Sequence, residues 1–313
     1  MQTANVMDEL DTSFLAEAFS SSLPLPALLD PNFEDAIRHV LDNPGSLVRP
    51  RLVYQMATAY GLNPAHAQEL AVALEYFHTA SLLFDDLPCM DNALERRGVP
   101  CTHLVYGEEG AILTALALIN RAYALIWRAV AGCPRANQAQ AMAFIEHCLG
   151  VEGLLNGQSF DLHYSSLPRK LETTERIARS KTVSLIRLTL VLPAMLGGAS
   201  ARDLQQIERI SLFWGLGYQI VDDLKDVLQS EAQSGKTSAR DVQLGRPNIA
   251  AVIGIRGAVR RLTRFIDLGD RALQSLMVSR PELDFLERLR GELQQELARV
   301  TRDSCDLAER GRP

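Results

Sequence analysis

Six aspartates stand in two short groups, and each group directly follows an apolar run. The groups are Asp85, Asp86 and Asp91, and Asp222, Asp223 and Asp226. Carboxylates packed together raise one another's pKa unless a cation lies between them. Acids at the C-terminal end of a helix also oppose its dipole, so a solvated helix end explains the first group poorly. Both groups are therefore candidate Mg²⁺ ligands, because this ion binds a few carboxylates and completes its shell with water and phosphate oxygens.

The spacing within the second group supports a shared ion. Asp222 and Asp226 are four residues apart, so on a helix their side chains lie on one face and reach a common point. The two groups are 222 − 85 = 137 residues apart in the chain. We expect them to face each other across a helical bundle and to hold one diphosphate from both sides.

The elements that carry these groups are expected to be helices. Apolar residues recur at three- and four-residue spacing, for example at Leu70, Leu74 and Phe77, and this period predicts helices of roughly 10 to 25 residues. Asn63 is an expected N-cap, and Pro64 is the expected first residue of the following helix. No Gly-, Ser- or Pro-rich linker divides the chain. The sequence therefore predicts an all-α fold, a single large helical bundle with residues 1–313 as one domain.

Composition excludes several other classes of protein. The net charge of -6 offers no electrostatic reason to bind nucleic acid. Five scattered cysteines without a CxxC pair indicate a reduced, cytoplasmic chain. The first thirty residues lack the pattern of a signal peptide, and the most apolar stretches, at 111–119 and 188–199, are shorter than the ~18 residues of a membrane span. We expect a soluble protein without an integral membrane segment.

The two aspartate groups resemble the two aspartate-rich motifs of the trans-isoprenyl diphosphate synthases, the polyprenyl synthetase family. The first has the spacing Asp-Asp, four residues, Asp, and the second follows the pair Tyr218-Gln219 as in that family. The resemblance extends from Gly45 to Asn248 and is greatest to geranylgeranyl and farnesyl diphosphate synthases. It implies the isoprenoid synthase fold around a central cavity, a homodimer, and Mg²⁺, three ions when diphosphate is bound.

Further residues match the family one by one. By resemblance, catalytic roles fall to Asp85, Asp86, Asp222, Lys181 and Gln219. The substrate-binding residues implied in the same way are Arg49, His78, Arg96, Arg97, Gln158, Asp161, Lys181, Thr182, Gln219 and Lys236. Taken singly, each of these lysines is more often a solvated side chain, and a lone histidine in an apolar helix is more often a hydrogen-bonded core residue.

The resemblance implies a prenyltransferase reaction. An allylic diphosphate ionises, isopentenyl diphosphate attacks the cation, and loss of a proton leaves a longer trans-polyprenyl diphosphate. Product length depends on the depth of the cavity below the first motif. Ala80 and Ser81 are small there, and Phe77, one turn deeper, is the expected floor, which favours a C20 product over C15. Small residues inside a helix equally serve close helix packing.

The sequence departs from the family where the second substrate binds. The family pattern Gly-Gly-Lys-Arg-x-Arg-Pro is here Pro44 to Pro50, with Ser46 and Leu47 in place of the lysine and the first arginine; Arg49 is retained. The family's Gly-Asp after an Ala-Ile-Leu run is here Ala115-Leu116. Whether isopentenyl diphosphate is a co-substrate is therefore open. Two alternatives remain: a terpene-synthase-like lyase that ionises a prenyl diphosphate without condensation, and a non-catalytic partner subunit.

Overall fold

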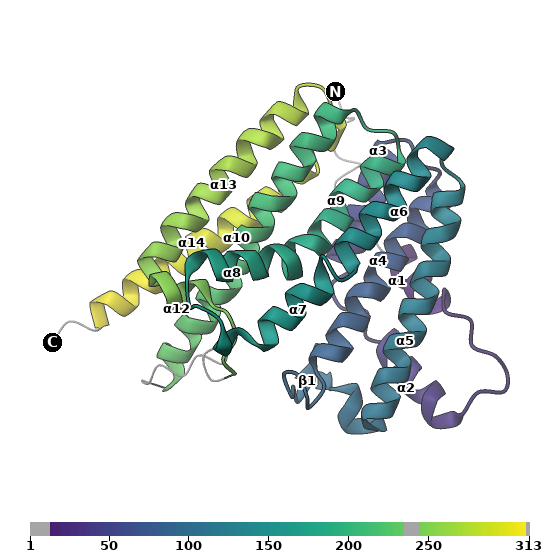
Figure 1. Ribbon diagram of the computed structural model, residues 1–313, viewed down its shortest axis with the longest axis horizontal. Helices are drawn as coiled ribbons and strands as arrows, with labels where there is room; N and C mark the ends of the chain where they lie inside the picture. Colours follow the sequence, from purple (N-terminus) through teal and green to yellow (C-terminus); the bar gives the residue numbers. More distant parts are fainter. Residues whose placement is uncertain (1–12, 235–243, 311–313) are drawn as a thin grey trace, which may run out of the picture. The chain divides into compact units, whose positions relative to one another are not determined.

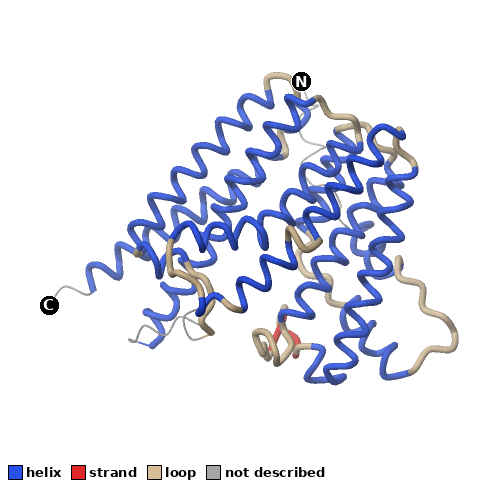
Figure 2. Tube along the Cα trace, viewed as in Figure 1, coloured by secondary structure: helices blue, strands red, loops and turns tan. Residues whose placement is uncertain are grey.

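The computed structural model describes residues 13–234 and 244–310, and these residues are almost entirely helical (Figure 2). In this part of the chain the only sheet is a hairpin of two short strands. The predicted all-α class is therefore confirmed. The chain separates into two compact units, Met1–Arg135 and Ala136–Pro313, which we call unit 1 and unit 2. That residues 1–313 form one domain stays a prediction.

Unit 1 consists of five helices and the hairpin among its described residues (Figure 1). The elements are α1 (Ser13–Ser21), α2 (Pro31–Leu41), α3 (Val48–Ala59), α4 (Pro64–Asp85), β1 (Glu95–Arg96), β2 (Val99–Pro100) and α5 (Thr102–Ala131). Helix α4 begins as expected, because the Asn63 side chain accepts a hydrogen bond from the Ala65 N–H and Pro64 follows the cap. Asp30 and Pro31 start α2 in the same way.

Helix α4 lies in the core of unit 1 and ends at the first aspartate group. Its buried residues lie on most sides of the helix, and α3 and α5 pack against it. The buried Tyr76 hydroxyl donates to the carbonyl of Phe19 at 2.5 Å, which ties α4 to the end of α1. Burial on several sides holds α4 firmly, so the carboxylates at its end have a rigid support.

The hairpin after the first aspartate group turns on Arg97 and Gly98. Both residues are left-handed, with φ of 57° and 81°, and they join β1 and β2 as a two-residue turn. Positive φ at both central residues is the geometry of a type I′ turn, which matches the twist of the strands. Gly98 adopts it without strain, whereas Arg97 carries a steric cost of about 1 kcal/mol. The turn holds Arg96 on a strand and Arg97 at the tip.

Unit 2 is also helical in its described residues. Its elements are α6 (Arg135–Leu149), α7 (Leu154–Leu162), η1 (Tyr164–Ser166), α8 (Leu171–Ala178), η2 (Arg179–Val183), α9 (Ser184–Leu196), α10 (Ala201–Ser234), α12 (Ile249–Ile253), α13 (Ile255–Met277), η3 (Pro281–Leu283) and α14 (Leu286–Arg310). Helix α10 carries the second aspartate group and packs on α9, α13 and α14. Segment η2 is a π-helical turn, a feature that often marks functional sites.

One helix among the described residues is long and apolar enough to cross a membrane. Helix α5 has 30 residues and an 18-residue stretch of mean hydropathy 1.5, of which 44% is buried within the protein. The apolar run at 111–119 is thus part of a longer apolar helix than its sequence suggested. Core helices of globular proteins pass the same test, so this finding is weak evidence for a span.

Candidate functional site

The first aspartate group surrounds the C-terminal end of α4. Asp85 is the last residue of the helix and Asp86 is its C-cap. The loop then folds back, because the N–H of Asp91 donates to the carbonyl of Asp85 at 2.9 Å. Asp85 and Asp91 are both partly accessible to solvent, whereas Asp86 is buried. The loop therefore returns the third acid to the first.

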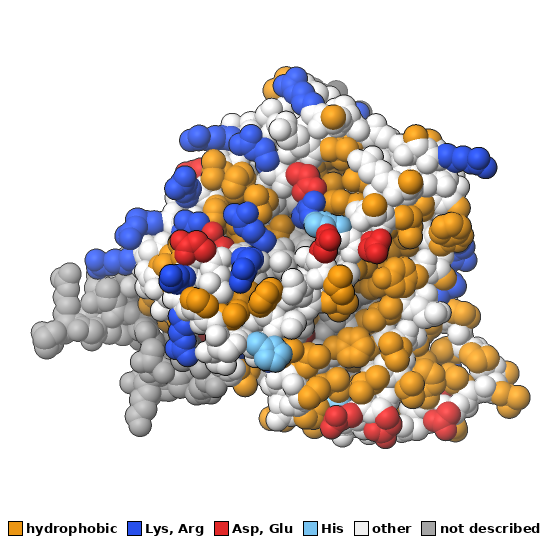
Figure 3. Space-filling view, in the orientation of Figure 1, with side chains coloured by type: hydrophobic (Ala, Val, Ile, Leu, Met, Phe, Trp, Pro, Cys, Tyr) orange, Lys and Arg blue, Asp and Glu red, His pale blue; other side chains and the backbone are white. Residues whose placement is uncertain are grey.

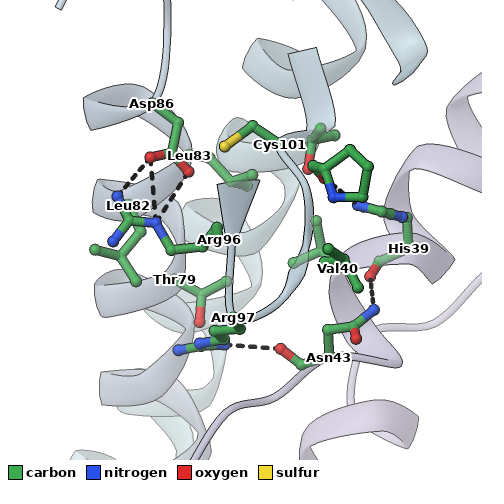
Figure 4. A pocket seen from close by; sticks show the side chains of 13 residues that line it. His39, Val40, Asn43, Thr79, Leu82, Leu83, Asp86, Arg96, Arg97 and Cys101 are labelled. Atoms are coloured by element: carbon green, nitrogen blue, oxygen red, sulfur yellow. Dashed lines mark hydrogen bonds and ion pairs between the residues drawn. The ribbon is translucent and has the colours of Figure 1, made fainter. Parts of the chain in front are cut away.

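The carboxylate of Asp86 is occupied by an arginine of the hairpin (Figure 4). Arg96 Nε lies 3.2 Å from both carboxylate oxygens, and Arg96 Nη2 lies 2.5 Å from Oδ1. The side chain of Asp86 is only 5% exposed, while that of Arg96 is 39% exposed. A bidentate arginine–carboxylate pair fixes the guanidinium in one orientation. Asp86 therefore sets the position of the cation that the sequence assigned to diphosphate.

The second aspartate group lies on α10 and, like the first, has two accessible acids and one buried acid. Asp222 is exposed and Asp226 is partly exposed, but Asp223 is only 1% exposed. Desolvation by the surrounding protein raises the pKa of Asp222; the nearby Lys225 and Lys181 oppose this rise, and Asp226 adds to it. A carboxylate that is open to solvent and has a raised pKa gains from a nearby cation. Asp222 has the properties expected of a metal ligand.

The structure does not bring three acids of either group to one point. In the described part of the chain, no three His, Cys, Asp or Glu side chains converge as an ion-binding cluster. The reason is visible in each group, since the middle aspartate points into the protein. Two accessible carboxylates per group still suit Mg²⁺, which usually keeps several waters and binds substrate phosphates. The metal roles of Asp86 and Asp223 stay predictions.

Unit 1 has a second cluster of charged residues around Glu75, which lies one helical turn before His78. The Glu75 carboxylate is buried and lies 3.7 Å from Arg49 Nη1 and 3.5 Å from Arg97 Nη2. Burial raises the pKa of Glu75, and both arginines act against that rise. Burial also lowers the pKa of His78 to about 2, assisted by Arg49, Arg97 and Arg96. His78 is therefore neutral, and the two arginines carry the positive charge.

Arg97 also connects the hairpin to the loop before α3. Its Nη1 donates to the Asn43 carbonyl at 2.8 Å, and its guanidinium lies against Gly45. A Cβ at Gly45 would lie 2.5 Å from Arg97 Nε and would displace the guanidinium, and Gly45 has φ of 75°, a conformation in which any other residue is strained. The predicted residues Arg49, His78 and Arg97 thus lie in one cluster, beside the departed Ser46 and Leu47.

Unit 2 gathers cations around Asp161. Lys181 Nζ donates to Asp161 Oδ2 at 3.2 Å, and Arg246 Nε lies 3.8 Å from the same oxygen. Gly157 permits this arrangement, because a Cβ there would lie 2.6 Å from the backbone nitrogen of Lys181. Helix α7 therefore packs directly on the π-helical turn. Gln158, next to Gly157, is half-buried on the same helix.

Comparison with other proteins decides the family. Residues 30–272 match the polyprenyl synthetase family. The chain belongs to that family. It is 35% identical over 249 residues to geranylgeranyl pyrophosphate synthase 9, chloroplastic, of Arabidopsis thaliana; the match covers 78% of this chain and 69% of that protein. The predicted family and enzyme class are therefore confirmed, and this polyprenyl synthetase is a trans-prenyltransferase.

Two solved structures support the isoprenoid synthase fold. Geranyltranstransferase from Thermotoga maritima superposes with a TM-score of 0.74 at 26% identity, over 91% of this chain and 97% of the other. Geranyltransferase from Helicobacter pylori, complexed with magnesium and isoprenyl diphosphate, gives a TM-score of 0.73 at 25% identity, over 96% and 99%. The predicted fold is confirmed, and Mg²⁺ is the metal used by the polyprenyl synthetase family.

The structure of this polyprenyl synthetase adds Arg246 to the site and leaves one predicted residue undescribed. The side chain of Arg246 is 9% exposed beside Asp161 and Lys181. The segment Gly245-Arg246-Pro247 has the composition of a turn, and its position shortly after the second aspartate motif is the signal that could have identified Arg246. Lys236 lies outside the described residues.

The residues expected to limit product length lie on two sides of α4. Phe77 packs edge-on against Tyr123 of α5, with ring centroids 4.9 Å apart. Ala80 is completely buried, whereas Ser81 is partly exposed and donates to the His78 carbonyl at 2.7 Å. Helix α5 packs on α4, so the burial of Ala80 is what close helix packing requires. The chain-length roles of all three residues stay predictions.

Proposed function

We propose that this polyprenyl synthetase condenses an allylic diphosphate with isopentenyl diphosphate to a trans-polyprenyl diphosphate of about C15 to C20. The relative from Arabidopsis thaliana is named as a geranylgeranyl pyrophosphate synthase, which supports a product in this range. The observation that carries the proposal is the second cationic cluster, Arg49 and Arg97 around Glu75. A lyase that ionises one diphosphate has no use for a second anion site.

Different residues are assigned to metal binding and to diphosphate binding. Asp85, Asp91, Asp222 and Asp226 would hold Mg²⁺, three ions when diphosphate is bound, and the metal would supply positive charge that stabilises a departing diphosphate. Lys181 and Arg96 bind the allylic diphosphate as its C–O bond breaks. The double bond of isopentenyl diphosphate then forms the new C–C bond, and the proton that is lost passes to the released diphosphate.

The binding site for isopentenyl diphosphate has fewer cations than the family pattern. Ser46 is exposed beside Gly45 and Arg97, where a lysine would reach a phosphate. Leu47 is 6% exposed, so its side chain belongs to the core and not to an anion site. A charge-assisted hydrogen bond contributes about 1.5 to 3 kcal/mol. We therefore propose that isopentenyl diphosphate binds roughly ten to a hundred times more weakly than in a protein with the lysine.

The apolar surface of α5 supports a homodimer. After the kink at Gly107, large solvent-accessible apolar side chains recur on this helix at spacings of four and seven residues; they are Ile112, Leu116, Tyr123 and Trp127. Orange side chains gather over this region in Figure 3. Neighbouring exposed apolar side chains that form one surface often mark an interface. We propose that a second copy of the chain covers α5.

We also propose that the protein acts in the cytoplasm without an integral membrane segment.

One assay tests the proposed reaction. The purified protein is incubated with Mg²⁺ and a C5, C10, C15 or C20 allylic diphosphate, with and without isopentenyl diphosphate. We expect longer diphosphates only when isopentenyl diphosphate is present. Hydrocarbon products in its absence would favour the lyase, and no turnover in any combination would favour the non-catalytic subunit. A matched Asp85→Asn variant controls for contaminating activity.

A further inference from the structure

Asp223 is the most enclosed acid of the two motifs, and its hydrogen bonds reach Gln219 on the same helix and the segment at the start of α12. Its Oδ1 accepts a hydrogen bond from Gln219 Nε2 at 2.9 Å. Its Oδ2 accepts from the N–H of Ile249 at 2.6 Å, and its backbone carbonyl accepts from Asn248 Nδ2 at 3.1 Å. The residue is 1% exposed. Both carboxylate oxygens therefore accept hydrogen bonds from other groups of the protein.

The first of these contacts determines the orientation of the Gln219 amide. A carboxylate can only accept, so the NH₂ end of Gln219 must face Asp223. The carbonyl end then faces Thr182, whose hydroxyl donates to Gln219 Oε1 at 2.6 Å. The three side chains form one directed chain of hydrogen bonds, in which each bond polarises the next. Thr182 lies in the π-helical turn next to Lys181.

The contacts of Asp223 with Asn248 and Ile249 lead to a second cation, Arg246. Asn248 is buried, and its Oδ1 caps α12 by accepting from the Ala251 N–H at 2.9 Å. Arg246 lies two residues earlier, and its guanidinium is beside Asp161 and Lys181. Asp223 thus connects to both segments that carry cations. Its Oδ1 leads through Gln219 and Thr182 to the turn with Lys181, whereas its Oδ2 and its backbone carbonyl hold Ile249 and Asn248, which follow Arg246.

We infer that Asp223 is a positioning residue and not a metal ligand: it orients the Gln219 carbonyl toward Thr182 and attaches the Arg246 loop to α10. The inference rests on the proposed function only for its effect on turnover. Its first consequence is electrostatic. With Asp223 in place, the oxygens of Thr182 and Gln219 lie together beside Lys181, where they present negative partial charge toward a substrate that becomes cationic. Reversing the amide would present N–H groups instead.

A swap of two side chains tests the orientation. In Asp223→Asn the new amide can still accept from Ile249, but its NH₂ then faces Gln219 and reverses that amide. The double variant Asp223→Asn with Gln219→Glu restores an acceptor toward Thr182, because the carboxylate now stands at position 219. The single Gln219→Glu variant is the matched control, since it places two carboxylates side by side.

Thermal unfolding gives a readout that does not depend on the reaction. Both single variants are expected to lower the Tm by several degrees, and the double variant is expected to recover at least half of the larger loss. Additive losses in the double variant would overturn the inferred hydrogen-bond chain, whatever the enzyme catalyses. Where a single variant does not fold, recovery of a folded double variant is the supporting result, and failure of both is the contrary one.

Turnover and metal binding separate positioning from ligation. We expect Asp223→Asn to lower kcat by ten- to a hundredfold. In the double variant Asp223→Asn with Gln219→Glu, we expect kcat to be at least fivefold higher than in Asp223→Asn alone. Calorimetric titration with Mg²⁺ and inorganic pyrophosphate should give a Kd within threefold of the parent for Asp223→Asn, but at least tenfold weaker for Asp222→Asn. Equal weakening in both variants would make Asp223 a ligand. Thr182→Val removes the far end of the chain, and an unchanged kcat there would also overturn the inference.

Discussion

The guanidinium of Arg96 is held against the carboxylate of Asp86 by contacts from Nε and Nη2, with Asp86 nearly enclosed and Arg96 open on one side. The pair joins the first aspartate motif to the hairpin that follows it. An arginine held in this way is already oriented when a diphosphate arrives, so less side-chain entropy is lost on binding.

Replacing aspartates one at a time should divide the first motif into two kinds of residue. Asp85→Asn is expected to lower kcat by a thousandfold or more, because an accessible carboxylate that holds Mg²⁺ is lost. Asp86→Asn should lower kcat by only ten- to thirtyfold and should weaken folding by about 1 to 3 kcal/mol, because Arg96 loses a charged partner. Steady-state kinetics and urea unfolding measure the two effects. Equal losses of kcat in both variants would contradict this division.

Restoring a cation in the depleted loop should strengthen binding of isopentenyl diphosphate. Ser46 is exposed next to Gly45, on which Arg97 packs, so the Ser46→Lys side chain can reach the same anion as Arg97. We expect KM for isopentenyl diphosphate to fall roughly tenfold, in line with about 1.5 kcal/mol for a charge-assisted contact. KM for the allylic substrate should not change. Ser46→Gln is the uncharged control, and an equal gain in that variant would exclude a charge effect.

Product length should respond to the two residues one turn apart on α4. Phe77→Ala removes the ring that packs on Tyr123 and is expected to lengthen the main product by at least one C5 unit. Ser81→Phe fills the partly exposed position and is expected to shorten it to C15 or below. Chromatography of the dephosphorylated products measures both changes. Ala80→Gly is the control, because a buried packing position should alter stability and leave length unchanged; a shift there would assign the floor to Ala80.

The neutral His78 makes stability depend on pH in a defined direction. Its pKa is lowered to about 2 in the folded protein, from an ordinary value of 6.5. Below pH 6.5 the unfolded chain binds a proton at this residue and the folded protein does not, so stability falls as the pH falls toward 2. The slope is at most about 1.4 kcal/mol per pH unit. His78→Gln should reduce this slope, as measured by urea unfolding between pH 7 and 5; an identical slope would show that His78 protonates when folded.

A charge on the apolar face of α5 should prevent association. Trp127→Glu places a carboxylate among the accessible apolar residues of this helix and is expected to convert the dimer to a monomer. Leu28→Glu is the matched control, since Leu28 is 96% exposed outside any helix and should leave the dimer intact. Light scattering coupled to gel filtration measures both masses. A monomeric parent protein would refute the proposed interface.

The sequence alone determined the helices, the family and most of the site residues, because these depend on local pattern. Apolar spacing predicts helices, Asn63 and Pro64 mark a helix start, and the two aspartate motifs are specific enough to identify a family. Even the departure at Ser46 and Leu47 needs only a comparison of motifs.

Which aspartate faces solvent was decided by tertiary structure. Asp85 and Asp86 are neighbours with the same side chain, as are Asp222 and Asp223, so composition and spacing cannot separate them. Their roles differ because Asp86 meets Arg96 across a hairpin turn, and Asp223 meets Ile249, which is 26 residues away along the chain. Arg246 joins Lys181 for the same reason. Burial and hydrogen bonding are properties of the packed chain, and only packing distinguishes a carboxylate that can hold a metal from one that holds the protein.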